Sequence, residues 1–154
     1  MSDVVTVERT IPASPEAVFA LISDPRRHHE FDGSGTVRTA KDVPDKLQLG
    51  ATFGMNMRIA LPYTMVSRVV EYEQDRRLAW KTLPAYPLVD RLAGGRIWRY
   101  ELEPTEGGTL VRESWDISQE SPITRSMVRR SAGVTRKNMA ATLAKIEEVL
   151  ACDS

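Results

Sequence analysis

The chain has 154 residues, of which 42% are apolar and 27% charged, which is enough apolar material for the core of one globular domain. Its 21 lysines and arginines balance 21 aspartates and glutamates, so no overall field favours nucleic acid or acidic lipid as a partner. We therefore expect one domain over residues 1–154, with no nucleic-acid partner and no stable insertion into a membrane.

The N-terminal segment MSDVVTVERTIP has neither the basic start nor the long apolar run of a secretion signal. The single cysteine, Cys152, leaves no disulfide partner within the chain and excludes a multi-cysteine metal site. We expect a cytoplasmic protein, monomeric or homodimeric, that uses no cofactor and no metal.

The stretch VVTVERTI is rich in β-branched residues and predicts a first strand over residues 3–10. Two helix starts follow, because Ser14 and Asp24 are capping residues that each stand directly before a proline. The second helix is expected over only residues 25–31, since two glycines follow closely. Two short helices therefore follow one strand.

From residue 34 to residue 117 the chain reads as β-rich segments separated by turn residues. The connections are too short for crossover helices, which favours an antiparallel arrangement. The predicted strands cover residues 34–41, 50–58, 63–73, 77–83, 95–103 and 109–117.

A capping serine and a proline at residues 121–122 then begin a long C-terminal helix, which Gly133 is expected to weaken or bend. Its apolar residues recur at steps of three or four, so they form one stripe. This stripe needs cover, and the sheet is the only partner large enough. Its members are Val128, Ala132, Thr135, Met139, Leu143, Ile146 and Leu150.

The predicted order of elements, with DP opening the second helix, EYEQDRRLAW across one hairpin and WRYELEPTEGGTLVRESWD across the next, resembles the START-like (SRPBCC) superfamily. That superfamily includes the birch pollen allergen and bacterial polyketide cyclase/dehydrase proteins. The resemblance implies an α+β helix-grip fold, in which a seven-stranded curved antiparallel sheet wraps around the long C-terminal helix. It also implies a ligand cavity between them, but members range from lipid carriers to aromatase/cyclases, so fold alone names no activity.

The last hairpin can be placed in register from its sequence. A loop at residues 105–108 puts Trp98 opposite Trp115 and Tyr100 opposite Glu113, all on one face. Glutamate and arginine then pair on the other face, which favours an aromatic interior and a charged exterior.

Two neighbouring strands complete the predicted inner wall. One of them directs three apolar side chains inward by its alternation: Phe53, Met55 and Met57. A loop at residues 73–77 would set Val70 beside Trp80 and turn Arg68 inward as well. Arg68 and Glu113 would then be buried charges, each costly unless it pairs with the other or with a ligand.

Both histidines lie in the stretch SDPRRHHEFDGSG, residues 23–35. Neighbouring residues on a helix project about 100° apart, so at most one of His28 and His29 faces the cavity and a metal site is not expected. His28 and Asp32 are four residues apart, which would suit a general acid or base oriented by a carboxylate. A hydrogen bond at the helix end is the simpler interpretation, and we favour it. Glu113 is the stronger polar candidate.

The catalytic candidates are therefore His28, Asp32 and Glu113. The expected ligand-contacting residues are Phe31, Phe53, Met55, Met57, Arg68, Trp80, Trp98, Tyr100, Trp115, Met139 and Leu143. The alternative is that the aromatic residues and methionines fill the core completely. We favour a cavity lining, since a sheet wrapped around one helix rarely fills its own interior.

The leading hypothesis is a protein that binds a small hydrophobic or amphipathic molecule, such as a lipid, a polyketide or another aromatic compound. Residues 83–94 and 25–35 would form the entrance. A second hypothesis is a polyketide cyclase or dehydratase in which His28 or His29, Asp32, Arg68 or Glu113 transfers protons. A third is a protein-interaction or stress-response module.

The segment RSMVRRSAGVTRK, residues 125–137, carries five cations among thirteen residues and could contact acidic lipid. We favour a solvated helix face instead, since Glu147 and Glu148 follow and the chain is neutral overall.

Overall fold

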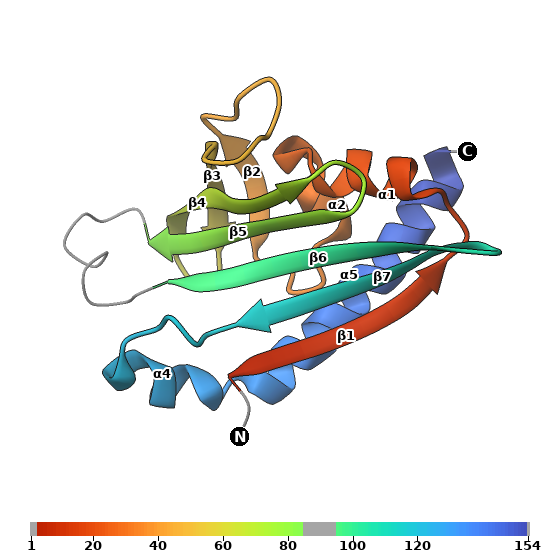
Figure 1. Cartoon of the computed structure of the whole chain (residues 1–154). Helices are drawn as coiled ribbons and strands as arrows, with labels where there is room; N and C mark the ends of the chain where they lie inside the picture. The colour runs from red at the N-terminus through yellow and green to blue at the C-terminus, as the bar shows by residue number, and fades with distance from the viewer. Residues whose placement is uncertain (1–2, 85–94, 154) are drawn as a thin grey trace.

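The protein folds as one antiparallel sheet of seven strands with a long helix against one face, as the computed structural model in Figure 1 shows for residues 3–84 and 95–153. The strand order is β1-β7-β6-β5-β4-β3-β2, so β1 forms one edge of the sheet beside β7, and β2 forms the other edge. The strands are β1 (Val4–Ile11), β2 (Val37–Lys41), β3 (Thr52–Arg58), β4 (Pro62–Glu73), β5 (Arg77–Pro84), β6 (Arg96–Thr105) and β7 (Gly108–Asp116). This confirms the predicted helix-grip architecture and all seven strands.

The first strand is followed by two short helical segments, as predicted. Helix α1 (Pro15–Ile22) begins where the Ser14 hydroxyl accepts a hydrogen bond from the Ala17 amide at 3.2 Å. The Asp24 carboxylate likewise caps the 3₁₀ turn η1 (Pro25–Arg27), which continues into α2 (His28–Phe31). Each cap satisfies an amide that the first helical turn leaves unpaired.

The C-terminal helix is interrupted, whereas the sequence predicts one continuous helix. Helix α4 (Pro122–Arg129) ends before α5 (Ala132–Asp153) begins. At the break, the amide and the hydroxyl of Ser131 both donate to the Val128 carbonyl, at 2.9 and 2.7 Å. This shorter i→i−3 pattern replaces the α-helical ladder, and Gly133 follows in the first turn of α5.

The long helix α5 buries the central part of the predicted stripe, namely Met139, Leu143 and Ile146, together with Thr142. It packs chiefly across β1, and α2 packs against its other side. Within the described residues, no helix is long and apolar enough to cross a membrane.

The register of the β6–β7 hairpin is as predicted: Trp98 lies opposite Trp115, and Tyr100 lies opposite Glu113. Pairing continues to Thr105 and Gly108, so the turn is shorter than the predicted four-residue loop. Since side chains alternate along a strand, this register fixes which residues face the helix.

The β4–β5 hairpin departs from its predicted register. A bulge at Val70 shifts the pairing, so that Val69 rather than Val70 lies opposite Trp80. Val69 is buried and Arg68 is exposed on the outer face. The prediction that Arg68 points inward is therefore wrong, and Arg68 cannot be the buried partner of Glu113.

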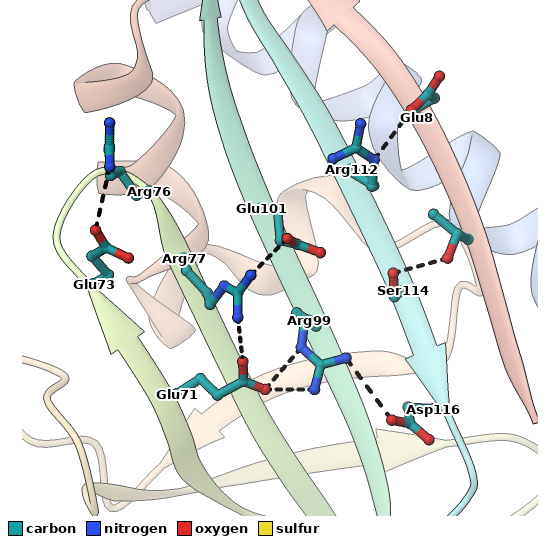
Figure 2. Close-up of polar contacts among 11 residues, drawn as sticks. Glu8, Glu71, Glu73, Arg76, Arg77, Arg99, Glu101, Arg112, Ser114 and Asp116 are labelled. Atoms are coloured by element: carbon teal, nitrogen blue, oxygen red, sulfur yellow. Dashed lines mark hydrogen bonds and ion pairs between the residues drawn. The ribbon is translucent and has the colours of Figure 1, made fainter.

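The outer face of the sheet is held by ion pairs, as Figure 2 shows. Arg77 bridges Glu71 and Glu101 at 3.0 and 2.9 Å, and Arg99 links Glu71 to Asp116 at its other end. A charged, solvated outer face leaves the concave face for the apolar side chains.

Gly33 allows the segment after α2 to lie directly against α5. Its amide donates to the Thr142 hydroxyl at 2.9 Å, and a Cβ at this position would lie 2.1 Å from the Asn138 carbonyl oxygen. We predict that Gly33→Ala lowers the free energy of unfolding by about 3 kcal/mol, because backbone atoms would have to move apart. The measurement is urea unfolding.

Gly133→Ala is the matched control, since nothing lies within 4 Å of its added Cβ, and it should be neutral or slightly stabilising. Equal stability of Gly33→Ala and the unsubstituted protein would contradict the close approach.

Candidate ligand-binding site

A cavity of about 380 Å³ lies between the concave face of the sheet and α5. This volume is in the range of small-molecule sites, about 300–1,000 Å³. Its walls come from α2, strands β2 to β7 and α5. Most of the predicted ligand-contacting residues line it: Phe31, Phe53, Met55, Met57, Trp80, Trp98, Tyr100 and Met139.

Three predicted contact residues lie elsewhere. Arg68 is on the outer face, as described above. Trp115 is buried in a separate cluster with Val5 and Ile117, where α5 packs on the sheet and fills the space. Leu143 belongs to the main core cluster. Trp115 and Leu143 lie on the inward faces that their sequence spacing predicts. They are packed in the core where α5 contacts the sheet, so they do not line the cavity.

His28 joins an aromatic cluster in the cavity wall. Its ring stacks on Trp80 with centroids 5.1 Å apart, and it meets Phe31 and Phe53 edge-on. Its Nε2 lies 2.9 Å from the Ile22 carbonyl oxygen, which can only accept, so Nε2 carries the proton. Burial lowers the pKa of His28 to about 4. The imidazole is therefore neutral near pH 7, and Nδ1 keeps its lone pair.

One histidine faces the cavity and the other does not, as the sequence predicts: His29 is exposed. The alternative in which the Asp32 carboxylate orients His28 is wrong, whereas the favoured interpretation, a hydrogen bond at the helix end, holds for Asp32. Although both residues are within the described part of the chain, no hydrogen bond joins their side chains. The Asp32 carboxylate instead accepts from the Ser34 hydroxyl at 2.8 Å and from the Val37 amide at 3.0 Å.

Asp32 borders the cavity and shapes the start of β2. It ends α2 with an extended backbone, and its two oxygens hold the tight turn that follows. This turn is why β2 begins at Val37 and not at residue 34. Its side chain therefore has the helix-end role that the simpler interpretation describes.

Glu113 is buried in the opposite wall of the cavity. The Tyr100 hydroxyl donates to its Oε1 at 3.1 Å, whereas Oε2 has no hydrogen-bond partner among residues 3–84 and 95–153. Burial raises the pKa of Glu113 to about 8, and the nearby charge of Asp32 raises it further against the effect of Tyr100. Near pH 7 Glu113 is therefore mostly a neutral acid, able to donate a hydrogen bond.

A more polar side of the cavity was not found from the sequence. Arg96 lines it and pairs with the buried Glu120 at 2.9 Å, and the Ser67 and Thr82 hydroxyls lie 2.9 Å apart. The correct β4–β5 register would have placed Ser67 inside with Met65. No local signal joins Arg96 to Glu120, because 24 residues separate them.

A metal centre is not evident in the described ranges: no group of three or more histidine, cysteine, aspartate or glutamate side chains is arranged to hold an ion. The polar groups that line the cavity are His28, Asp32, Arg96, Glu113, Asn138 and several hydroxyl groups.

A family model described as "Polyketide cyclase / dehydrase and lipid transport" matches residues 2–151. The chain belongs to this family. A relative, the protein Rv0088 of Mycobacterium tuberculosis, is 36% identical to this chain over 151 residues. The match covers 93% of this chain and 61% of Rv0088, so the chain spans about three fifths of that relative's length.

Solved structures share the fold of this family member. Protein NE0264 from Nitrosomonas europaea aligns with a TM-score of 0.74 and 16% identity, over 99% of this chain and 97% of that chain. CV1439 from Chromobacterium violaceum aligns with a TM-score of 0.73 and 14% identity, over 97% of this chain and 98% of that chain. DynU16, a protein in the dynemicin biosynthetic locus, aligns with a TM-score of 0.69 and 13% identity, over 97% of this chain and 48% of the DynU16 chain. At these identities the likeness shows the fold alone.

The pKa of Glu113 makes stability depend on pH. The unfolded chain ionises this carboxyl at its ordinary pKa of 4.5, whereas the folded chain keeps the proton up to about pH 8. The contribution of protonated Glu113 to the free energy of unfolding is therefore fully present below pH 4.5, and it is lost as the pH rises towards 8. We predict that Glu113→Gln, which cannot ionise, removes this loss, by up to about 5 kcal/mol at pH 8.

The measurement is urea unfolding at a series of pH values. Glu103→Gln, an exposed glutamate on the same hairpin, controls for loss of one carboxylate. Parallel pH profiles for Glu113→Gln and the unsubstituted protein would show that burial does not hold the proton on Glu113.

Proposed function

We propose that this protein binds a small hydrophobic or amphipathic molecule carrying a hydrogen-bonding oxygen, in the cavity between the sheet and α5. The observation that carries the proposal is the buried Oε2 of Glu113, which lacks a partner among the described residues and borders an aromatic cavity. An unmade hydrogen bond at a buried group costs about 1–3 kcal/mol. A ligand oxygen that accepts from Glu113 would recover this energy.

The cavity walls indicate the rest of the ligand. Trp80 already stacks on one planar ring, that of His28, and Phe53 and Tyr100 lie close to it. Flat aromatic or polyene surfaces fit such walls. Methionines add a flexible apolar lining that adapts to irregular shapes. A ketone, ester or hydroxyl oxygen on a polyketide, aromatic compound or lipid would meet both requirements, and these classes agree with the family description.

Met65 and Val66 offer a matched test, since they are neighbours on β4 with opposite orientations. Met65 lines the cavity, whereas Val66 is exposed on the other side of the sheet. We predict that Met65→Trp weakens the binding of fluorescent fatty acids or flat aromatic dyes at least about tenfold by filling the space. Val66→Trp should bind as the unsubstituted protein does. Fluorescence titration measures both, and equal binding by the two variants would place the ligand outside the cavity.

A second candidate, a cyclase or dehydratase activity, is favoured by the protonation states of two groups on this cavity. His28 is neutral with a free lone pair on Nδ1, and Glu113 is a neutral acid. These are the forms required of a general base and a general acid. In a dehydration, His28 would take a proton from the carbon beside a carbonyl. Glu113 would protonate the hydroxyl that leaves from the next carbon as water, so a double bond forms.

The enzyme hypothesis predicts that Glu113→Gln and His28→Gln each lower turnover of a linear β-hydroxy or poly-β-ketone substrate about 100-fold or more. Binding of the dehydrated product should persist within a few-fold, because each glutamine keeps a hydrogen-bond donor at its position and the other lining side chains are unchanged. Product formation by chromatography and binding by fluorescence separate the two effects. Unchanged turnover in both variants would remove these residues from the mechanism and leave the binding function.

A further inference from the structure

Two large apolar residues of helix α4 face solvent, while a third, Val128, packs against the cluster around Trp115. Ile123 and Met127 lie one turn apart, with 82% and 68% of their surface exposed, and no residue of this helix is fully buried. Most short helices gain their stability by burying an apolar face. Helix α4 therefore exposes large apolar side chains of the kind that most short helices bury against their own protein.

Several polar contacts, together with the packing of Val128, hold α4 to the protein. Arg129 donates from Nε to Asp3 at 2.8 Å, and Arg125 donates from Nη2 to the Glu120 carbonyl oxygen at 3.0 Å. The Thr124 hydroxyl donates to the Glu120 carboxylate at 3.0 Å. These contacts orient the helix, so the exposure of its two outer apolar residues is built into the attachment.

Apart from Asp3 and Glu120, which contact the attached side of α4, the charged residues of α4 and of the first turns of α5 are cations. Residues 121–146 contain no aspartate or glutamate. Arg130, which directly follows α4, and Arg136 and Lys137 near the start of α5 are exposed, as is the apolar Val134 between them in sequence. An apolar surface edged by cations complements a surface that is negatively charged above an apolar interior.

A second group of exposed apolar residues lies at the same end of the sheet. Ile59 and Leu61 project from the β3–β4 turn. Antiparallel pairing places this turn beside the end of β5, the start of β6 and the end of β7, after which α4 follows (Figure 1). Ile59 also borders the cavity, so the rim of the cavity belongs to this end.

We propose that this end of the molecule, with α4 at its centre, docks on an anionic lipid bilayer. Ile123 and Met127 enter the interfacial region, while the surrounding cations contact the headgroups. These side chains stand clear of their neighbours, so they can insert among lipid chains, whereas a protein partner would need a separate pocket for each. Docking would bring the cavity rim to the bilayer and allow an apolar ligand to pass without crossing water, which is the one step that rests on the proposed function.

The test is sedimentation of the whole chain with vesicles of phosphatidylcholine alone or with about one third phosphatidylglycerol. The expected result is binding to the anionic vesicles that weakens with added salt. Ile123→Ser with Met127→Ser should weaken it at least about tenfold. Leu49→Ser is the matched control: Leu49 is 67% exposed in the loop before β3, at the opposite end of the sheet, and its loss should leave binding unchanged.

Folding and the cavity are checked separately. The double variant should keep the unfolding midpoint and the affinity for a cavity dye in lipid-free solution, since neither residue lines the cavity. A failure of dye binding in the unsubstituted protein would therefore count against the proposed function and not against docking. Absence of binding to anionic vesicles, or binding that survives the double substitution, would overturn the proposal. So would stable capture of an acidic protein by α4 without vesicle binding.

Discussion

The cavity exists because α5 covers only part of the concave face of the sheet. A curved sheet of seven strands is far wider than one helix, and α5 packs closely only where β1 and β7 meet it. There Trp115 is packed in a cluster with Val5 and Ile117, and Met139 belongs to this cluster and also lines the cavity. Towards β3, β4 and β5 the sheet curves away, and its inward side chains face the cavity. The hollow is thus a consequence of geometry, since one helix cannot follow the whole concave face.

Withdrawal from water then determines the chemistry of that hollow. The same physical cause, the cost of a buried charge, raises the pKa of Glu113 and lowers that of His28. Both groups are left neutral, one with a proton to donate and the other with a lone pair. A partner such as Arg68 would have reversed the effect on Glu113, but the bulge in β4 keeps that cation outside. One extra residue in a strand therefore decides the electrostatics of the site.

The two ends of the sheet differ in a related way. At the end occupied by α1 and α2, short helices pack against α5 and place aromatic groups in the wall. At the other end, α4 is attached through arginines and Val128, and it leaves Ile123 and Met127 exposed. Ile59, at this end, also lines the cavity, so the proposed contact with an anionic bilayer would lie on the side of the molecule where the cavity reaches this end of the sheet.

The sequence by itself determined the order of elements, the helix caps, the β6–β7 register and the family, because these depend on contacts between near neighbours and on alternation along a strand. It also named Glu113 and the two histidines among its polar candidates, together with Asp32 and Arg68, but it did not decide which histidine faces the cavity. Tertiary structure decided what local patterns cannot carry: the bulge at Val70, the break at Ser131, the pairing of Arg96 with Glu120, and which inward side chains meet a helix or a cavity. Alternation states the face on which a side chain lies, but only the packing of distant segments decides what lies opposite that face.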